Sequence, residues 1–182
     1  MIVRRTLLLL LALLPAVAAA QDAPPPLRTV DHVDLDRYLG RWYEVAHIPN
    51  RFQKQCACCS SAEYALQEDG RLRVVNRCVK EDGELDQAGG VAEIVDRESN
   101  AKLRVSFVSF LGWRPFWGDY WIIGLDPDYR WAVVGTPDRK YGWVLSRTPA
   151  LEAADRERVE AVLRDGGYAL EAFVTDRQEA SP

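Results

Sequence analysis

The fold of this chain is decided by a short stretch near its start, Gly40-Arg41-Trp42-Tyr43-Glu44-Val45-Ala46. The stretch is strand-like, and its Gly lets the backbone bend so that the Trp indole can lie across the floor of a barrel. A late strand carries Arg147, just before a proline and a long amphipathic helix. Arg stacked on Trp is a favourable cation–π pair, worth about 1–2 kcal/mol when partly desolvated. We therefore expect Arg147 to stack on Trp42 where the barrel closes; a core Trp in a β-sandwich with an exposed Arg is the alternative.

The first 20 residues predict a secretory signal peptide. Two arginines precede an apolar run, Leu7–Leu14, and the small residues Ala18 and Ala20 lie before the expected cleavage at Gln21. The run is too short for a stable membrane span, although an uncleaved N-terminal anchor stays open. No Cys near the cleavage point offers an acceptor for a lipid anchor. We expect an exported, periplasmic protein that is at most peripheral to the outer membrane.

The rest of the chain predicts a single domain. Residues 21–29 contain three consecutive prolines and predict an extended tether. Residues 30–177 form the expected domain, of a size typical for one unit, and 178–182 a disordered tail. Without the two leader arginines the formal net charge changes from −4 to −6. Because no basic stripe is present, nucleic acid is not expected as a partner.

Alternating polar and apolar residues, separated by turn residues, predict an all-β fold. The clearest alternation lies within 102–110, where Leu103, Val105 and Phe107 share a face. Short turns require antiparallel neighbours, and eight such strands can close into a barrel that holds one small ligand. We therefore predict an eight-stranded antiparallel up-and-down barrel with a C-terminal α-helix packed outside. The expected strands are 41–48, 59–67, 71–80, 88–96, 102–110, 117–125, 130–135 and 141–147, followed by a helix from 149 to 165 and a last short strand, 168–174.

Three motifs, in this order, resemble those of the lipocalin family. They are Asp36–Glu44, Asp126–Tyr129 and Leu145–Pro149. Further segments, among them Val74–Arg77, are similar to the branch that holds the bacterial lipocalins and apolipoprotein D. The resemblance covers nearly all of 30–176. It implies an eight-stranded barrel with a C-terminal helix, and structural roles for Gly40, Trp42, Asp126 and Arg147.

The resemblance also implies a function, which is to carry small hydrophobic molecules. Bacterial members are associated with the outer membrane and with fatty acids and lysophospholipids. Many of them are lipoproteins, and the missing acceptor Cys is a departure from that pattern. The family function would be binding, storage or transport of such lipids in the cell envelope for membrane maintenance, without a cofactor or a metal.

A carrier needs an apolar cavity, which the inward positions of alternating strands would supply. Each buried methylene of an acyl chain contributes about 0.8 kcal/mol, so a long chain can reach micromolar affinity even after association costs. The alternative is that the 18 aromatic residues fill the barrel and leave an interaction protein. The candidate ligand-binding residues are Ala46, Phe52, Tyr64, Val105, Phe107, Tyr120 and Tyr141.

The connection around Phe110–Trp117 is unusually apolar for a loop. Exposed aromatic residues of this kind mark lipid interfaces or partner contacts. We expect Trp113, Phe116 and Trp117 to rim the mouth of the barrel and to touch membrane lipid or a second subunit in a homodimer. The alternative is a loop folded onto the barrel.

The four cysteines predict a disulfide, because an exported protein meets an oxidising compartment. Cys78 lies across the expected hairpin from about residue 59–61, so Cys59–Cys78 is the predicted bridge and Cys58–Cys78 the second choice. A bridge that closes about 20 residues stabilises by roughly 3 kcal/mol. Cys56 and Cys58 would then be left over. A thiolate metal site built from all four cysteines stays open as an alternative.

The sequence gives little support for an enzyme. His32 and His47 are its only histidines, and no Ser-His-acid spacing, His pair or Gly-rich phosphate loop is present. We expect His47 to be a solvated or rim residue. A few lipocalin-like proteins are enzymes, one of them with a Cys nucleophile in its cavity, so Cys59 or Cys78 stays open in that role.

Overall fold

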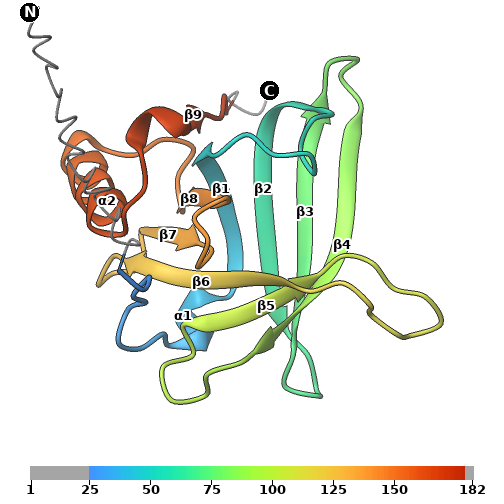
Figure 1. Ribbon diagram of the computed structural model, residues 1–182. Helices are drawn as coiled ribbons and strands as arrows, with labels where there is room; N and C mark the ends of the chain where they lie inside the picture. The colour runs from blue at the N-terminus through green and yellow to red at the C-terminus, as the bar shows by residue number, and fades with distance from the viewer. Residues whose placement is uncertain (1–24, 179–182) are drawn as a thin grey trace, which may run out of the picture.

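The computed structural model describes residues 25–178. Within this range the chain forms a closed antiparallel β-barrel with one long helix on its outside (Figure 1). The predicted leader, the first part of the tether and residues 179–182 lie outside the described residues. No helix of the described part is both long and apolar enough to cross a membrane.

Eight strands make the barrel, and each pairs antiparallel with the next along the chain. β1 also pairs with β8, which closes the sheet and confirms the predicted fold. The strand predicted over 168–174 was wrong for most of its length, because a 3₁₀ turn, η1, occupies Leu170–Ala172. The strands are β1 (Gly40–His47), β2 (Cys56–Leu66), β3 (Leu72–Lys80), β4 (Leu85–Ile94), β5 (Lys102–Ser106), β6 (Gly118–Leu125), β7 (Trp131–Gly135), β8 (Gly142–Ser146) and the short β9 (Val174–Thr175); the α-helices are α1 (Leu35–Tyr38) and α2 (Ala153–Asp165).

Two apolar clusters hold these elements together. One fills the inside of the barrel at the end that α1 covers, and the other lies between the outer face of the barrel and α2. Helix α2 packs closely because β6 has Gly124 beneath it, where a Cβ would lie 2.6 Å from Val162 Cγ1. Leu27 is buried in this outer cluster. The described part of the predicted tether, 25–29, therefore packs on the barrel and does not extend freely.

The residues of the expected motifs hold one end of the barrel closed. The guanidinium of Arg147 lies 3.7 Å from the centroid of the buried Trp42 ring, as the sequence predicted. It also donates hydrogen bonds to backbone carbonyls of Arg37, Arg41 and Leu39. Gly40 takes a positive φ of 89°, and a Cβ there would lie 3.6 Å from Arg147 Nη1. The first strand and the last barrel strand are thereby joined at the floor.

Asp126 holds the turn between β6 and β7 at the same end. Its buried carboxylate accepts hydrogen bonds from the backbone N–H of Asp128 and from the side chain of Arg130. Arg130 also pairs with Asp155 of α2 at 2.9 Å. These contacts keep the pKa of Asp126 below its usual value despite its burial. The motif thus fixes the turn and ties it to the outer helix.

The disulfides differ from the prediction. Cys78 is bonded to Cys56, and Cys58 is bonded to its neighbour Cys59. The predicted Cys59–Cys78 bridge and its second choice were therefore wrong. All four sulfurs are oxidised in this arrangement, which leaves none of the four cysteines as a thiolate for a metal or as a nucleophile.

The cause of this difference is an irregular register in β2. Ser61 lies opposite Arg77, but Cys58 lies opposite Val79 and Cys56 opposite Lys80, because the pairing shifts twice between Cys56 and Ser61. At each shift β2 has one extra residue that has no partner in β3. The extra residues bring Cys56, rather than Cys59, within reach of Cys78.

Candidate functional site

The two ends of the barrel are different. Successive antiparallel strands alternate in direction, so the loops 48–55, 81–84, 107–117 and 136–141 all lie at one end. Helix α1 covers the opposite end, where Val33 and Tyr38 are fully buried. The candidate site is therefore at the end away from α1, which we call the open end.

Three tyrosines form the floor of the interior. The hydroxyl of Tyr120 lies 2.8 Å from that of Tyr38 and 2.8 Å from that of Tyr64. Burial raises the pKa of all three phenols, so each stays neutral in the folded protein. Tyr64 and Tyr120 point inward as predicted. Their hydroxyl groups are already bonded to one another at the bottom of the barrel.

Above this floor the interior is open to solvent. Asn76 and Ala88 lie opposite each other on β3 and β4, and Asn76 also pairs with Ala62, which is in the inner cluster. Both Asn76 and Ala88 therefore face inward, yet both are exposed. Exposed side chains on the inner face of a closed sheet mean that water, or a ligand, can enter there.

Val105 and Phe107 stand on the wall of this open region. Val105 is half-buried and packs against the inner cluster. The ring of Phe107 covers Gly90, where a Cβ would lie 2.6 Å from Phe107 Cδ1, and 39 % of Phe107 remains exposed. Both residues face inward, and their predicted role in ligand binding stays a prediction.

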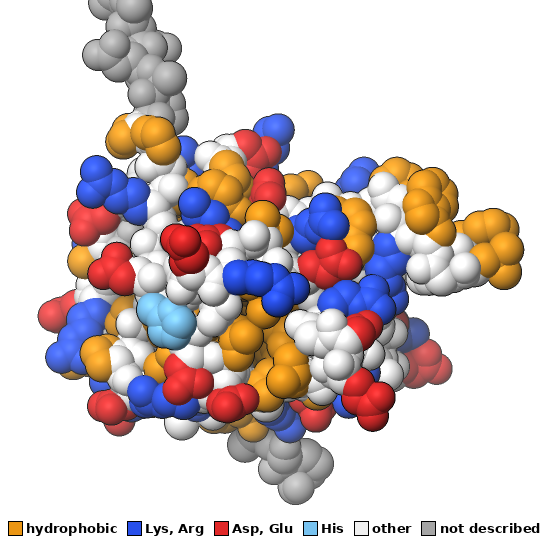
Figure 2. All heavy atoms as spheres, turned by 90° about the horizontal axis from the view of Figure 1, so that it is seen from below, with side chains coloured by type: hydrophobic (Ala, Val, Ile, Leu, Met, Phe, Trp, Pro, Cys, Tyr) orange, Lys and Arg blue, Asp and Glu red, His pale blue; other side chains and the backbone are white. Residues whose placement is uncertain are grey.

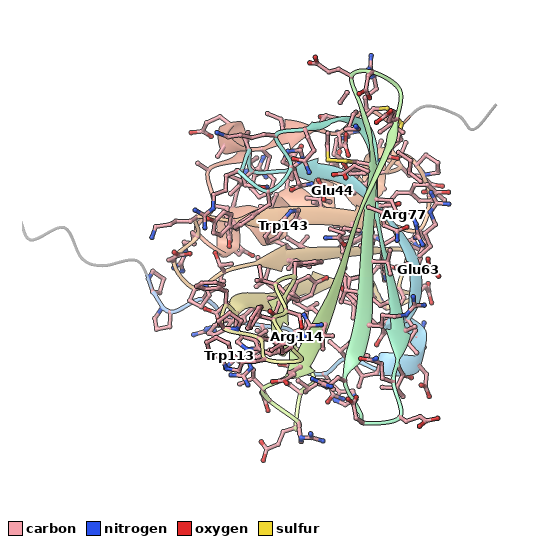
Figure 3. All side chains as sticks on the ribbon, turned by 90° about the vertical axis from the view of Figure 1, so that its right-hand side faces the viewer. Glu44, Glu63, Arg77, Trp113, Arg114 and Trp143 are labelled. Atoms are coloured by element: carbon pink, nitrogen blue, oxygen red, sulfur yellow. A yellow bond between two sulfur atoms is a disulfide. The ribbon has the colours of Figure 1, made fainter. Side chains whose placement is uncertain are left out.

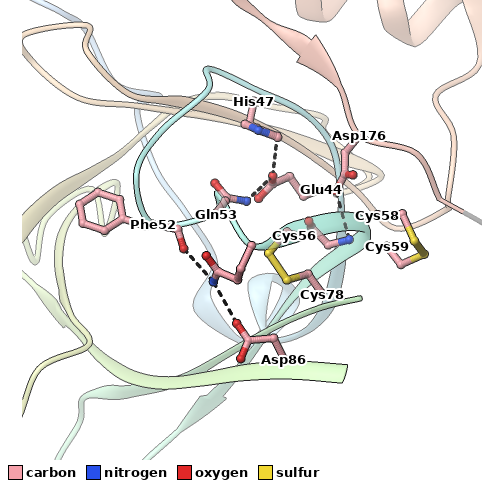
Figure 4. Close-up of a disulfide and its surroundings, with 12 residues drawn as sticks. Glu44, His47, Phe52, Gln53, Cys56, Cys58, Cys59, Cys78, Asp86 and Asp176 are labelled. Atoms are coloured by element: carbon pink, nitrogen blue, oxygen red, sulfur yellow. Dashed lines mark hydrogen bonds and ion pairs between the residues drawn. A yellow bond between two sulfur atoms is a disulfide. The ribbon is translucent and has the colours of Figure 1, made fainter. Parts of the chain in front are cut away.

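A β-bulge in β1 sets a polar group beside this wall. The pairing with β8 shifts between Glu44 and Ala46, so Val45 is an extra residue. As a result Glu44 and His47, three residues apart, face the same interior, with Glu44 Oε1 2.8 Å from His47 Nδ1 (Figure 4). Figure 3 shows Glu44 and Trp143 on neighbouring strands at this end.

Gln53 connects this pair to the loop above it. Its Nε2 donates to Glu44 at 2.6 Å, and its Oε1 accepts from Asn50 and from the indole of Trp143. Burial raises the pKa of Glu44, against the opposing effects of His47 and Gln53. Burial alone would lower the pKa of His47, but the hydrogen bond and charge of Glu44 outweigh it and raise that pKa. His47 is thus half-buried and paired rather than fully solvated, and it lies at the rim, as one of the two expectations had it.

Aromatic rings line the entrance next to this network. Tyr141 stacks on Trp143 with centroids 6.0 Å apart, and Phe52 lies 5.7 Å from Tyr141. Phe52 is 55 % exposed, whereas Tyr141 is half-buried. A surface depression of about 310 Å³ adjoins them, lined by His47, Pro49, Asn50, Arg51, Gln53 and Lys54.

Ala46 does not belong to the interior, so that prediction was wrong. The bulge at Val45 places Ala46 opposite Val144, on the outer face. There Ala46 lines a groove of about 240 Å³ between the barrel and α2. A regular strand would have kept Ala46 on the face of Glu44, and the extra residue reverses it.

The segment 107–117 is exposed, as predicted. Trp113 and Phe116 are 67 % and 69 % exposed, and the segment projects from the body of the barrel (Figure 2). Trp117 differs, because its indole donates to the Arg114 carbonyl and lies under the guanidinium of Arg104. Trp117 therefore anchors the base of the segment, and the alternative of a loop folded onto the barrel was wrong for its tip.

Several residues of the site were not singled out from the sequence. Trp143 is two residues from Tyr141 on one strand, and this spacing was a usable signal for a shared face. Glu44 and Gln53 gave no such signal, because only the bulge and the fold of loop 48–55 bring them to His47. Asn76 faces inward by simple alternation, but its exposure depends on the three-dimensional structure.

Comparisons with known proteins agree with this geometry. A family model described as a lipocalin-like domain matches residues 33–178. The outer membrane lipoprotein Blc of Escherichia coli (strain K12) is 38 % identical over 181 residues, covering 93 % of this chain and 99 % of that protein. Apolipoprotein D of Rattus norvegicus is 30 % identical, with 97 % of each chain covered. The solved structure of insecticyanin from the tobacco hornworm Manduca sexta has a TM-score of 0.69 at 24 % identity, with 86 % of each chain covered, and supports the fold.

Proposed function

The chain belongs to the lipocalin family, and from this premise we propose that it carries a fatty acid or a lysophospholipid in the open part of its barrel. Members of the family bind or transport small hydrophobic molecules. Our proposal is more specific than this general function, because it names the ligand as a molecule with one acyl chain and a polar head. What supports it is the combination of an open inner face at Asn76 and Ala88 with an apolar wall at Val105 and Phe107.

The polar groups at the entrance fit the head of such a molecule. Arg51 and Lys54 border the depression beside His47 and Gln53, and both are cations that suit a carboxylate or a phosphate. The aromatic rings of Phe52, Tyr141 and Trp143 lie between this polar entrance and the wall. An acyl chain would pass the rings toward Val105 and stop above the tyrosine floor.

The place of action that we propose is the cell envelope. The predicted leader directs export, and the bacterial relative at 38 % identity is named as an outer membrane lipoprotein. This chain would act in the periplasm beside the outer membrane and serve membrane maintenance. We propose binding rather than catalysis, because the Glu44–His47 pair has no nucleophile among its hydrogen-bond partners in the described residues.

The first experiment is native mass spectrometry of the protein purified from an exported fraction, followed by analysis of released lipid. We expect close to one fatty acid or lysophospholipid per barrel. An empty protein that also fails to bind a fluorescent fatty acid would contradict the proposal and favour a filled-barrel interaction protein.

A pair of variants tests the location of the ligand. Ala88→Trp places an indole on the open inner face, and we expect it to weaken fatty-acid binding at least tenfold. Gln87→Trp is the matched control, because Gln87 is the exposed neighbour whose side chain contacts Arg77 on the outer face. Binding that is equal in both variants would place the ligand elsewhere.

A further inference from the structure

Exposed large apolar side chains gather at the open end of the barrel. Eleven such side chains are exposed in the described residues, and eight of them lie in, or directly next to, the four loops at this end. Six belong to the single segment 107–117, which starts at Phe107 on the inner wall and then projects from the molecule at the right in Figures 1 and 2. They are Phe107, Val108, Phe110, Leu111, Trp113 and Phe116. A contiguous apolar surface of this kind marks an interaction site.

The tip of this segment has a defined structure. Phe110 and Trp113 exchange two backbone hydrogen bonds of 2.9 Å, which makes a tight hairpin turn. Leu111 occupies that turn with a positive φ of 49° and is 93 % exposed. A left-handed conformation is unfavourable for leucine, and the side chain packs on little of the protein. The turn thus presents Leu111 outward at a conformational cost.

The base of the segment is anchored to the barrel. Arg114 Nη1 donates to the Ser106 carbonyl at 3.0 Å, and the Trp117 indole donates to the Arg114 carbonyl at 3.0 Å. These two hydrogen bonds fix the base of the hairpin, so that its tip projects beside the opening of the barrel. We call residues 107–117 the apolar hairpin.

The charge of the apolar hairpin favours one class of partner. The segment has no Asp or Glu, although the chain has 27, and its one charged residue is Arg114. Arg51 and Lys54 lie across the opening, in loop 48–55, and make no ion pair within the described part of the chain. An apolar tip with a cation at its base and no acidic residue suits a phospholipid surface, in which acyl chains lie beneath phosphates.

We propose that the apolar hairpin inserts its tip into a phospholipid bilayer, with Arg114 at the level of the phosphates. The opening of the barrel would then lie at the lipid surface. A second copy is a poorer fit, because a symmetric contact between two hairpins would bring their Arg114 side chains toward one another, with no acidic residue in the segment to pair with them. The turn 81–84 at the same end is acidic, so contact would be made by the hairpin rather than by the whole rim.

This inference goes beyond ligand carriage, since a barrel that takes up dissolved ligand needs no contact with a bilayer. The test is co-sedimentation of the purified protein with vesicles of phosphatidylethanolamine and phosphatidylglycerol. We expect binding that weakens at least tenfold in the double variant Trp113→Ser, Phe116→Ser. The matched control is Leu66→Ser, Val95→Ser, which removes two side chains that are 51 % and 62 % exposed at the closed end. We expect its binding to stay within twofold of the unmodified protein.

Two results would overturn the proposal. One is an unmodified protein that does not bind these vesicles; the other is equal binding by the hairpin variant and the control. A dimer that the hairpin substitutions dissociate, without vesicle binding, would assign the surface to a second copy instead. Fatty-acid binding in solution, measured without vesicles, shows that the variants are folded. It also separates the two proposals. A protein that binds vesicles but does not bind fatty acid in solution would contradict the proposal of ligand carriage and leave the proposal of membrane insertion standing.

Discussion

Glu44 and His47 face one another inside the barrel, with Glu44 Oε1 2.8 Å from His47 Nδ1. They are three residues apart, and in a regular strand two residues at this separation would point to opposite faces of the sheet. The extra residue Val45 makes the contact possible. Glu44 is buried and His47 is half-buried, and His47 lines the depression at the proposed entrance for the ligand. Its protonation therefore affects both stability and the environment of a bound head group.

The titration of His47 is the first prediction. Its pKa is raised above 6.5, because Glu44 outweighs the effect of burial. In Glu44→Gln the charge is lost while burial stays, so we expect the pKa of His47 to fall. Proton NMR can measure this directly, since His32→Ala removes the only other histidine signal. A His47 midpoint that is unchanged in Glu44→Gln would contradict the pairing.

The same shift gives the sign of the pH dependence of stability. A raised pKa in the folded state means that the folded protein holds the His47 proton more tightly than the unfolded chain does. The stabilisation is fully present below pH 6.5 and is lost as the pH rises through the raised pKa. We expect the difference in free energy of unfolding between the unmodified protein and His47→Gln to shrink over this range. A difference that grows with pH would contradict the raised pKa of His47.

The contact of Arg147 with Trp42 yields the second prediction. Lysine keeps the charge but lacks the planar fork that stacks on the ring and donates to several carbonyls. We expect Arg147→Lys to lower the free energy of unfolding by about 2 kcal/mol in urea titrations. Arg41→Lys is the control, because Arg41 is exposed and lies over the ring of Tyr43 at 4.7 Å. Its effect should stay within about 0.5 kcal/mol, and a similar loss in both variants would show that the Trp42 contact is not special.

The fold was predictable because its signals are local and repeated. Alternation of polar and apolar residues marked the strands, and short turns required antiparallel neighbours. The Trp42–Arg147 contact followed from the order of the elements, and the structure has it at 3.7 Å. The apolar composition of the loop around Trp113 left two possibilities, an exposed tip or a loop folded onto the barrel, and only the structure decides for the exposed tip.

Two of the predictions that failed, those on Ala46 and on the partner of Cys78, share one physical cause. The bulge at Val45 turned Ala46 outward, and the irregular register between Cys56 and Ser61 exchanged the partner of Cys78. A bulge adds one residue without any change in composition, so alternation alone does not reveal it. Alternation also does not show how deep in the barrel an inward side chain lies. Tyr64 faces inward as expected, but it belongs to the floor.

The disulfides give the third prediction. The Cys56–Cys78 bridge spans 22 residues along the chain, and its removal should cost about 3 kcal/mol by the loop-entropy relation. The Cys58–Cys59 bridge joins neighbours and closes almost no loop, so we expect Cys58→Ser, Cys59→Ser to be much milder than Cys56→Ser, Cys78→Ser. Urea unfolding compares the two variants. Peptide mapping without reduction checks the pairing, and a Cys59–Cys78 peptide would refute it.

The tyrosine floor gives the fourth prediction. Tyr120 bonds to both Tyr38 and Tyr64, so Tyr120→Phe leaves two buried hydroxyl groups without this partner. Tyr64→Phe keeps the Tyr38–Tyr120 bond and removes only one interaction. Because an unsatisfied buried hydroxyl costs roughly 1–3 kcal/mol, we expect Tyr120→Phe to destabilise by about 2–4 kcal/mol and Tyr64→Phe by about 1 kcal/mol. Urea unfolding at neutral pH measures both. Equal costs would mean that water or a rearranged side chain replaces the lost hydroxyl, and that the floor is not sealed.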